Sequence, residues 1–449
     1  MIITYRIEPE DSYVCAENDK VIDFSKNDSF LYTFWNLKDR FPFWYDTKAL
    51  DILYLSFAVF VADRLFKRDD AVDAWSRDFK LNVPVINEEL FSENAKLLQE
   101  MLSFLTGDHW TFSFRKRNLT HPELSHRDRP LKKGQVVKEY DRICMFSGGL
   151  DSFIGAIDLL EEKNTEKILF VSHYGGGKGT KEYQDFLKKV FVQQYNLEER
   201  DFCQFYAKAV GGVEDTTRSR SFMFFAHAVA LASAQGKPMD IIIPENGLIS
   251  LNIPSTFSRI GSSSTRTTHP YYMKRFQKLL NNLGLLITFN NPYQFKTKGE
   301  MLVECKNQEF MTANLNNTMS CSHPDIGRMY SEKESRHCGY CLPCVIRQAA
   351  ILHAGIKDTG SYRDRLFDSG PNAKTIRNSY LLGLRKFNPD AAFMTIQMNG
   401  PIESNIEEYA SLYIRGMQEL KQYMDTVILR NSGWIHICTL ICIIITTKC

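Results

Sequence analysis

The segment from Arg142 to Ser152, RICMFSGGLDS, constrains the fold more than any other part of this sequence. Residues 143–146 predict a short buried strand, and Phe153 to Leu160 carries apolar residues at helical spacing. Between them lie two glycines and two hydroxyl residues. Glycine lets the backbone approach a ligand, and the free N–H groups of a helix start point toward it. The turn therefore predicts a site for an anion, which we expect to be pyrophosphate; an ordinary strand-to-helix turn is the alternative.

The same alternation of strand and helix continues along the chain. A second apolar run, Ile168 to Val171, follows a charged gap and completes a strand, helix, strand unit. Further strands are predicted at Phe202 to Tyr206 and Asp240 to Pro244, with helices at Ser221 to Ala234 and Met273 to Leu283. We therefore expect an α/β fold whose parallel sheet has helices on both faces and binds its ligand at the carboxyl ends of the strands.

The 449 residues exceed one typical domain, and their pattern changes several times. Helices at Ala49 to Leu65 and Asn87 to Leu105, with alternating strands at Asp78 to Val85 and His109 to Arg115, predict an N-terminal α+β module. The predicted parts are this module (1–115), a charged, solvated linker (116–140), the α/β core (141–355), a helical C-terminal region (356–430) and an apolar tail (431–449).

Composition limits the class of protein. The chain carries 55 basic and 53 acidic residues, a net charge of +2, and so shows no general nucleic-acid footprint. The start, MIITYRIEPEDSYV, lacks the pattern of a signal peptide, and we expect a cytoplasmic protein. The apolar stretch Trp434 to Ile445 is shorter than the ~20 residues of a membrane helix, so no membrane span is expected.

Four of the eleven cysteines have the spacing of a metal site. Cys338, Cys341 and Cys344 form CGYCLPC, and Cys321 supplies a fourth thiolate upstream. Four thiolates fill a tetrahedral zinc ion and leave no position for water, so the predicted zinc is structural. Free thiols and an iron–sulfur cluster are the alternatives.

SGGLDS at 147–152 resembles the PP-loop of the N-type ATP pyrophosphatases at every position. Together with Cys321, the CGYCLPC segment and Arg347, it resembles the 7-cyano-7-deazaguanine synthase family, QueC. This resemblance covers residues 141–355. The longer layout is similar to the QueC-like proteins of bacterial antiphage operons, such as those of the Qat system.

The resemblance implies a PP-loop fold of the adenine nucleotide α-hydrolase type and an ATP-dependent ligase that forms an adenylate. It implies ATP, magnesium and structural zinc as cofactors and a 7-deazaguanine carboxylate as substrate, with ammonia or a protein amine as acceptor. A co-encoded defence protein would be the partner. The residues implied for ATP and pyrophosphate are Ser147, Gly148, Gly149, Leu150, Asp151, Ser152 and Lys298.

The resemblance also implies roles for charged residues outside this loop. Lys298 in FKTKGEM matches a lysine that binds phosphates, and Asp151 would orient magnesium or the loop. Arg220, with Arg218 beside it, stands where the family has an arginine before a helix, and we expect these arginines to clamp phosphate or carboxylate. Asp151, Lys298 and Arg220 are the predicted catalytic residues.

The predicted substrate region departs from the family sequence. Glu245 and Asn246 follow a strand and could read a guanine-like edge, with helix capping as the alternative. Arg259, Arg266 and His269 are candidate contacts for a carboxylate or phosphate, or else solvated loop residues. Residues 174–179 contain four glycines and predict a flap over ATP or a flexible connection.

Two other functions fit parts of the sequence. A PP-loop enzyme of tRNA modification or sulfur transfer should show a basic surface and a reactive cysteine pair near the loop, and neither is evident. A non-catalytic nucleotide-binding subunit of a defence complex would not need an intact SGGLDS.

Overall fold

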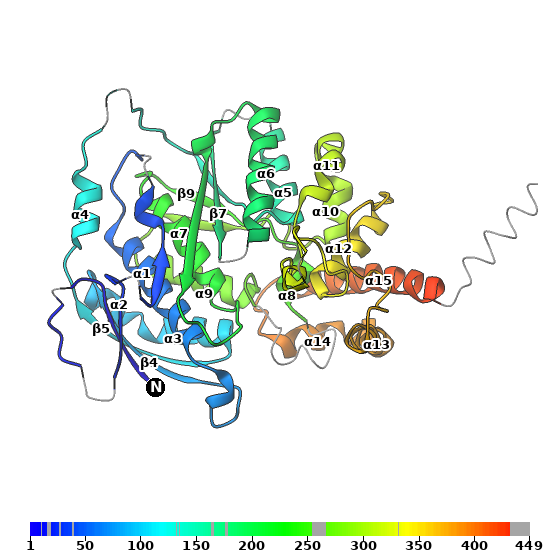
Figure 1. The fold of residues 1–449 in the computed structure, drawn as a ribbon, viewed down its shortest axis with the longest axis horizontal. Helices are drawn as coiled ribbons and strands as arrows, with labels where there is room; N and C mark the ends of the chain where they lie inside the picture. The colour runs from blue at the N-terminus through cyan, green and yellow to red at the C-terminus, as the bar shows by residue number, and fades with distance from the viewer. Residues whose placement is uncertain are drawn as a thin grey trace, which may run out of the picture.

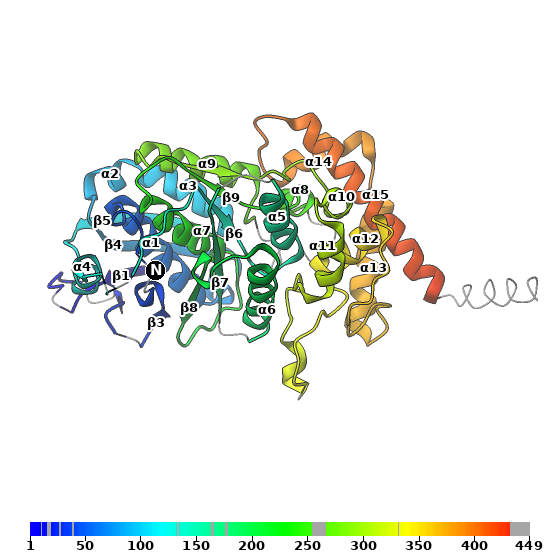
Figure 2. The same ribbon diagram turned by 90° about the horizontal axis from the view of Figure 1, so that it is seen from above.

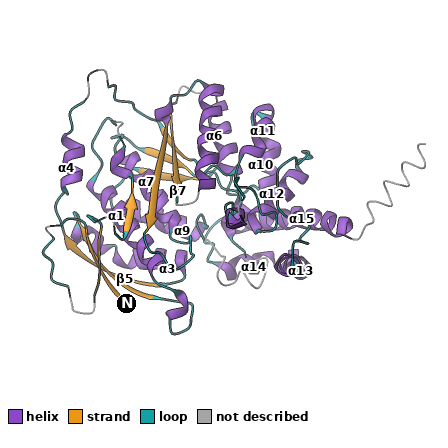
Figure 3. Ribbon diagram, viewed as in Figure 1, coloured by secondary structure: helices purple, strands orange, loops and turns teal. Residues whose placement is uncertain are grey.

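The computed structural model describes residues 1–9, 11–15, 19–26, 28–37, 40–131, 133, 135–162, 166–175, 178–253, 266–330 and 332–431. Within these ranges the protein is an α/β structure with a four-stranded and a six-stranded sheet, as the strand and helix pattern predicts (Figures 1 and 3). No described helix has the length and apolar character needed to cross a membrane.

The four-stranded sheet comes from the first part of the chain and is parallel throughout. Its order is β2-β1-β4-β5. The strands are β1 (Ile2–Arg6), β2 (Lys20–Asp23), β4 (Asp78–Val85) and β5 (His109–Lys116). The sequence predicts β4 and β5 and the helical crossover between them, which consists of α2 (Glu88–Glu93) and α3 (Ala95–Thr106).

The six-stranded sheet has the order β10-β9-β6-β7-β8-β3 and is parallel except for its edge strand β3. Its strands are β3 (Phe30–Tyr32), β6 (Arg142–Met145), β7 (Ile168–Tyr174), β8 (Phe202–Ala209), β9 (Met239–Ile242) and β10 (Ile287–Asn290). The strand β3 belongs to the N-terminal part of the chain, and it pairs with β8 through Phe30 and Ala209.

The helices cover both faces of this sheet, because the side chains of its central strands alternate between two hydrophobic cores. Ile143 of β6 points into one core with α1 and α7, and Cys144 points into the other with α5 and α6. The helices not yet given are α1 (Thr47–Leu65), α4 (His121–Asp128), α5 (Leu150–Glu161), α6 (Lys178–Tyr195), α7 (Arg220–Ser233), α8 (Gly247–Leu251), α9 (Pro270–Asn282), α10 (Lys298–Glu304), α11 (Gln308–Asn314), α12 (Leu342–His353), α13 (Pro371–Lys386), α14 (Ala392–Asn399) and α15 (Ile406–Asn431).

Helix α1 joins the two sheets. It packs against α7 and also contacts β4 of one sheet and β8 of the other. Its residues from Ala49 to Asp63 are buried without exception, so it has no solvent face. The N-terminal residues and the central sheet therefore share one hydrophobic core.

The last helices form a third core around α12 and α15, on the far side of the six-stranded sheet from the four-stranded one (Figures 1 and 2). Helix α15 contacts α12, α13, α14 and α8. The described residues from Pro371 to Asn431 thus include the helices α13, α14 and α15. The apolar tail lies outside the described residues from 432 onward.

Residues 116–140, for which the charges predict a solvated linker, contain α4. This helix begins with a capping box in which Thr120 and Glu123 each accept a hydrogen bond from the other's backbone N–H. Glu123 is fully buried and pairs with Arg117. Most of the described residues from 129 to 139 are exposed.

Candidate functional site

The predicted strand, loop and helix are present at 142–161. Strand β6 ends at Met145 and α5 begins at Leu150, with Gly149 as its N-cap. We call residues 146–149 between them the glycine loop. Gly148 needs to be glycine for two reasons: its φ is +84°, and a Cβ there would lie 3.0 Å from Cγ of Gln184.

The start of α5 presents backbone donors near the glycine loop. The N–H of Gly149 donates to Oγ of Ser147 at 3.3 Å, and the N–H of Leu150 makes a long 3.4 Å contact with Oγ of Ser320. The first intrahelical bond is made by the N–H of Phe153. Free N–H groups and the helix dipole favour an anion at such a position.

Asp151 lies in the first turn of α5 and is 5% exposed. Its Oδ1 is 2.9 Å from Nζ of Lys298, and its Oδ2 accepts hydrogen bonds from Nδ2 of Asn246 at 2.7 Å and from the Asn246 N–H at 3.2 Å. Burial favours a protonated Asp151, but the charge of Lys298 and these hydrogen bonds hold its pKa below the ordinary value. The structure thus brings Asp151, Asn246 and Lys298 together.

Glu245 joins this group as a second carboxyl. Burial, and then the negative charge of Asp151 and a hydrogen bond with it, raises the pKa of Glu245 well above its ordinary value. Two adjacent carboxyl groups that share a proton can release it to a divalent cation with oxygen ligands. Asp151 and Glu245 are therefore adjacent oxygen donors of the kind that divalent cations take.

Lys298 is placed by the start of α10. Thr297 and Glu300 form a capping box there, and the Thr297 hydroxyl donates to the buried carboxylate of Glu419 on α15. Lys298 itself is 4% exposed. Its ammonium group therefore approaches Asp151 from a helix start that the C-terminal region holds in place.

Arg220 is the first residue of α7. It is exposed, but enough protein surrounds its guanidinium to lower its pKa. After burial, the charge of Arg220 is the second cause that lowers the pKa of His173 in β7. Gln184 links this strand to the glycine loop, because its Nε2 donates to the carbonyl oxygens of Ser147 and His173 at 3.0 and 3.1 Å.

Three other residues predicted to contact phosphate or substrate, Arg218, Arg266 and His269, have partners outside the group of Asp151, Asn246 and Lys298. Arg218 donates from Nη1 to the Thr106 carbonyl oxygen at 2.7 Å. Arg266 donates from Nη1 to the Phe104 carbonyl oxygen at 3.1 Å, with its guanidinium over the Phe104 ring. His269 is fully buried against the same ring, and its Nδ1 accepts the Tyr271 N–H as the N-cap of α9.

Two predictions concern residues that the structure describes in part or not at all. Arg259 lies outside the described residues. Of the glycine-rich segment 174–179, residues 176 and 177 also lie outside, and α6 already begins at Lys178.

The four predicted metal ligands come together. The sulfur atoms of Cys321, Cys338, Cys341 and Cys344 all lie within 4.8 Å of one another. The Cys321–Cys341 and Cys338–Cys344 sulfur distances are each 3.9 Å, close to the ~3.8 Å between thiolates around a tetrahedral zinc with Zn–S bonds of ~2.3 Å. This confirms the predicted grouping and its capacity to hold a metal such as zinc.

Backbone donors surround these sulfur atoms, as expected for thiolates. The N–H groups of His323 and Cys338 donate to Sγ of Cys321, and the N–H of Cys341 donates to Sγ of Cys338, each at 3.3 Å. Such bonds stabilise negative sulfur and fix the ligand geometry.

The cysteine cluster and the glycine loop are linked through the residues that precede Cys321. The residues before Cys321 supply both links: the N–H of Met319 donates to the Gly148 carbonyl oxygen at 2.8 Å, and Ser320 faces the Leu150 N–H. Arg347, fully buried in α12, holds the same segment by donating to Oγ1 of Thr318 at 2.6 Å.

Sequence reasoning missed Gln184, Ser320 and the pairing of Glu245 with Asp151. Ser320 had one signal, because it directly precedes a predicted ligand. Gln184 had none, since it lies in the middle of an amphipathic helix.

A cavity of about 350 Å³ opens at the carboxyl ends of β9 and β10. Asn291, one of its lining residues, donates from Nδ2 to the backbone carbonyl oxygen of Glu245 at 2.8 Å, whereas the side chains of Asp151, Glu245 and Lys298 are not among the lining groups. Its walls also include Ile243, Ser250, Thr268, Phe289 and Gln294, together with the charged Lys274 and Glu403.

Comparison of the chain with protein-family models and with curated proteins finds no match.

Proposed function

We propose that the protein is an ATP-dependent ligase that forms an adenylate of a 7-deazaguanine carboxylate. The observation that carries this proposal is a buried ion pair, 2.9 Å long, between two helix starts: Asp151 lies in the first turn of α5, which follows a Ser-Gly-Gly loop, and Lys298 begins α10. The four-cysteine cluster beside that loop supports it, since the resemblance to the QueC family rests on the same two motifs.

The chemistry assigned to the site is transfer of AMP. A carboxylate oxygen of the substrate attacks the α-phosphorus of ATP, the bond from that phosphorus to the bridging oxygen breaks, and pyrophosphate leaves. An amine then attacks the acyl carbon, AMP leaves, and the amine nitrogen loses a proton. The acceptor is ammonia or the amine of a co-encoded protein.

The side chains around the glycine loop suit the first step. The start of α5 and the Lys298 ammonium are placed to hold the leaving pyrophosphate, and Arg220 to clamp phosphate oxygens, which stabilises the charge that develops there. Magnesium, when bound by Asp151 and Glu245, would neutralise phosphate charge. The substrate ring would occupy the neighbouring cavity beside Asn291.

Covalent thiol chemistry is not part of this proposal. Burial raises the pKa of Cys144, two residues before the glycine loop, and raises that of Cys305 to about 12. Thiols with raised pKa values are poor nucleophiles at neutral pH.

The test measures the products of ATP. Purified protein with ATP, magnesium and 7-carboxy-7-deazaguanine should release AMP and pyrophosphate, and Lys298→Met should slow this at least ~100-fold. Lys296→Met is the matched control, because Lys296 is two residues away but pairs with Glu304 on the surface. Release of ADP and phosphate would overturn the proposal, as would equal activity of the Lys298 variant.

Glu245→Gln tests the magnesium assignment. The variant keeps the size of the side chain but cannot become an anion, so we expect about tenfold more magnesium to be needed for half-maximal pyrophosphate release. An unchanged magnesium requirement would remove Glu245 from the ion.

A further inference from the structure

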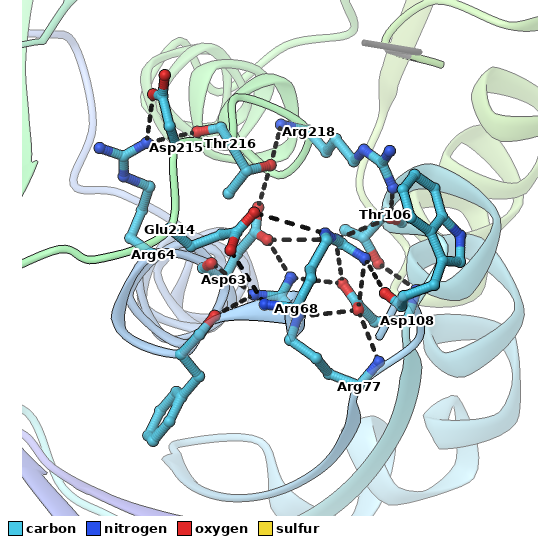
Figure 4. A network of polar contacts seen from close by, with 12 residues as sticks. Asp63, Arg64, Arg68, Arg77, Thr106, Asp108, Glu214, Asp215, Thr216 and Arg218 are labelled. Atoms are coloured by element: carbon cyan, nitrogen blue, oxygen red, sulfur yellow. Dashed lines mark hydrogen bonds and ion pairs between the residues drawn. The ribbon is translucent and has the colours of Figure 1, made fainter. Parts of the chain in front are cut away.

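The segment 213–219, which leads from β8 into α7, is held by residues of the N-terminal part of the chain (Figure 4). We call it the α7 approach. The N–H groups of Val213 and Glu214 donate to the Arg64 carbonyl oxygen, and Arg64 Nη1 donates to the Thr216 carbonyl oxygen at 2.9 Å. The segment is therefore tied to the end of α1 on both sides.

A network of buried charged residues lies next to these contacts. Asp63 and Asp108 share the guanidinium of Arg77, and Arg68 forms a 2.7 Å ion pair with Asp108. All four side chains are at least nine-tenths buried. Arg68 also contacts the α7 approach, because its backbone N–H donates to Oε2 of Glu214 at 3.0 Å. Such a network is rigid, because moving or removing one member leaves the buried charges of the others uncompensated.

Asp63 makes the contact closest to α7. Its Oδ2 accepts the Ser219 hydroxyl at 2.6 Å and the Ser219 N–H at 3.2 Å, and Oγ1 of Thr216 lies 3.4 Å away. Ser219 is the N-cap residue of α7 but makes no side-chain capping bond, because its hydroxyl is directed to Asp63.

The two arginines on either side of Ser219 point in different directions. Arg218 lies over the Trp75 ring, 4.8 Å from its centroid, on the N-terminal side. Arg220 is close enough to His173 in β7 for its charge to lower the pKa of that histidine, and no carboxylate in the described part of the chain pairs with Arg220. Ser219 is therefore the last residue of the anchored segment, and it directly precedes Arg220, whose guanidinium has no carboxylate partner among the described residues.

We propose that Asp63 is a positioning residue, which holds Ser219 and so sets the guanidinium of Arg220 at the phosphate site. This rests on the proposed function, in which Arg220 contacts ATP. It gives the N-terminal part a defined task in the site, although none of its residues touches the glycine loop in the described structure. It also explains why a buried carboxylate at the end of a fully buried helix accepts bonds from a segment 156 residues away.

The test uses Ser219→Ala, because replacing Asp63 would also remove one of the two aspartates that pair with the buried Arg68 and Arg77. The variant removes one hydrogen bond to a carboxylate and keeps the Ser219 N–H contact. We expect the full-length variant to bind ATP with magnesium about tenfold more weakly in calorimetric titration, the size usual for one charged hydrogen bond. Ser56→Ala is the matched control: Ser56 is buried in α1 and bonds only to the Leu53 carbonyl oxygen.

A double-mutant cycle separates positioning from simple stability. In an Arg220→Ala background, Ser219→Ala should have no further effect on the ATP dissociation constant, because the group that it positions is gone. If Ser219→Ala does not fold, Thr216→Val removes the neighbouring contact with Asp63 and takes its place in the cycle.

The outcomes are distinguishable. Wild-type protein that binds no ATP overturns the proposed function and this inference with it. Weakened binding in Arg220→Ala but not in Ser219→Ala or Thr216→Val overturns the inference alone. An equal loss in the presence and absence of Arg220 also overturns it, because the segment would then act by another route.

Discussion

The backbone N–H of Met319 donates a 2.8 Å hydrogen bond to the carbonyl oxygen of Gly148. Met319 lies two residues before Cys321 of the cysteine cluster. Ser320 adds a contact with the N–H of Leu150. The geometry of the glycine loop therefore depends on a segment whose own position is set by the cysteine cluster and Arg347.

Metal loss should therefore weaken nucleotide binding at a distance. Cys341→Ser should lower both the zinc content and the affinity for ATP, the latter about tenfold or more, because the segment before Cys321 loses its anchor. Elemental analysis and calorimetry check this. Cys305→Ser, a buried cysteine outside the cluster, is the control. A zinc-free Cys341→Ser protein with unchanged ATP affinity would show that the two sites are independent.

The Asp151–Lys298 pair should show strong coupling in stability. Each single change, Asp151→Asn or Lys298→Met, leaves a buried charge without its partner and should cost about 3–5 kcal/mol in unfolding free energy. The double variant should lose less than the sum, by about 1–3 kcal/mol. Urea unfolding measures all three. Additive losses would mean that the charges do not stabilise one another.

Two buried histidines should make the protein less stable in acid. Burial lowers the pKa of His227 to about 4 and that of His269 to about 3, from an ordinary value of 6.5. Between these values the unfolded chain binds more protons, so the unfolding free energy is highest above 6.5 and falls as the pH decreases, by about 1.4 kcal/mol per pH unit for each histidine.

Replacing one of these histidines checks the sign. His227→Gln should flatten the slope of the unfolding free energy between pH 4 and 6.5, whatever it does to the stability at neutral pH. An unchanged slope would show that His227 does not titrate on unfolding.

Gly155 should tolerate no side chain. It lies one turn into α5, and a Cβ there would come within 2.3 Å of Cβ of Pro244, just after β9. Gly155→Ala should cost about 1–3 kcal/mol, because α5 must move away from the sheet. Thermal unfolding measures this, with Gly175→Ala as control, since a Cβ at Gly175 meets nothing within 4 Å. Equal stability of the two variants would contradict the close packing.

Local sequence patterns predicted much of this structure. The strand, loop and helix at 142–161 follow from apolar spacing around two glycines, and the cysteine cluster follows from its spacing. The long buried helix α1 was also visible, because its residues are apolar over several turns.

The rest depends on contacts between distant residues. Ser320 meets Leu150 across 170 positions, and short strands such as β1, β3 and β10 form only because a partner strand is present. Arg218 and Arg220 look alike in the sequence, and only the network around Asp63 turns Arg218 toward Trp75.

The strand β3 and the helix α1 cover surfaces of the central part of the chain. It closes the edge of the central sheet beside β8, while α1 covers a face that would otherwise be bare. A protein starting at residue 116 would expose a row of unpaired backbone groups on β8 and a wide apolar surface on α7, both of which invite aggregation. The N-terminal residues are thus an integral part of the hydrophobic core that they share with the central sheet.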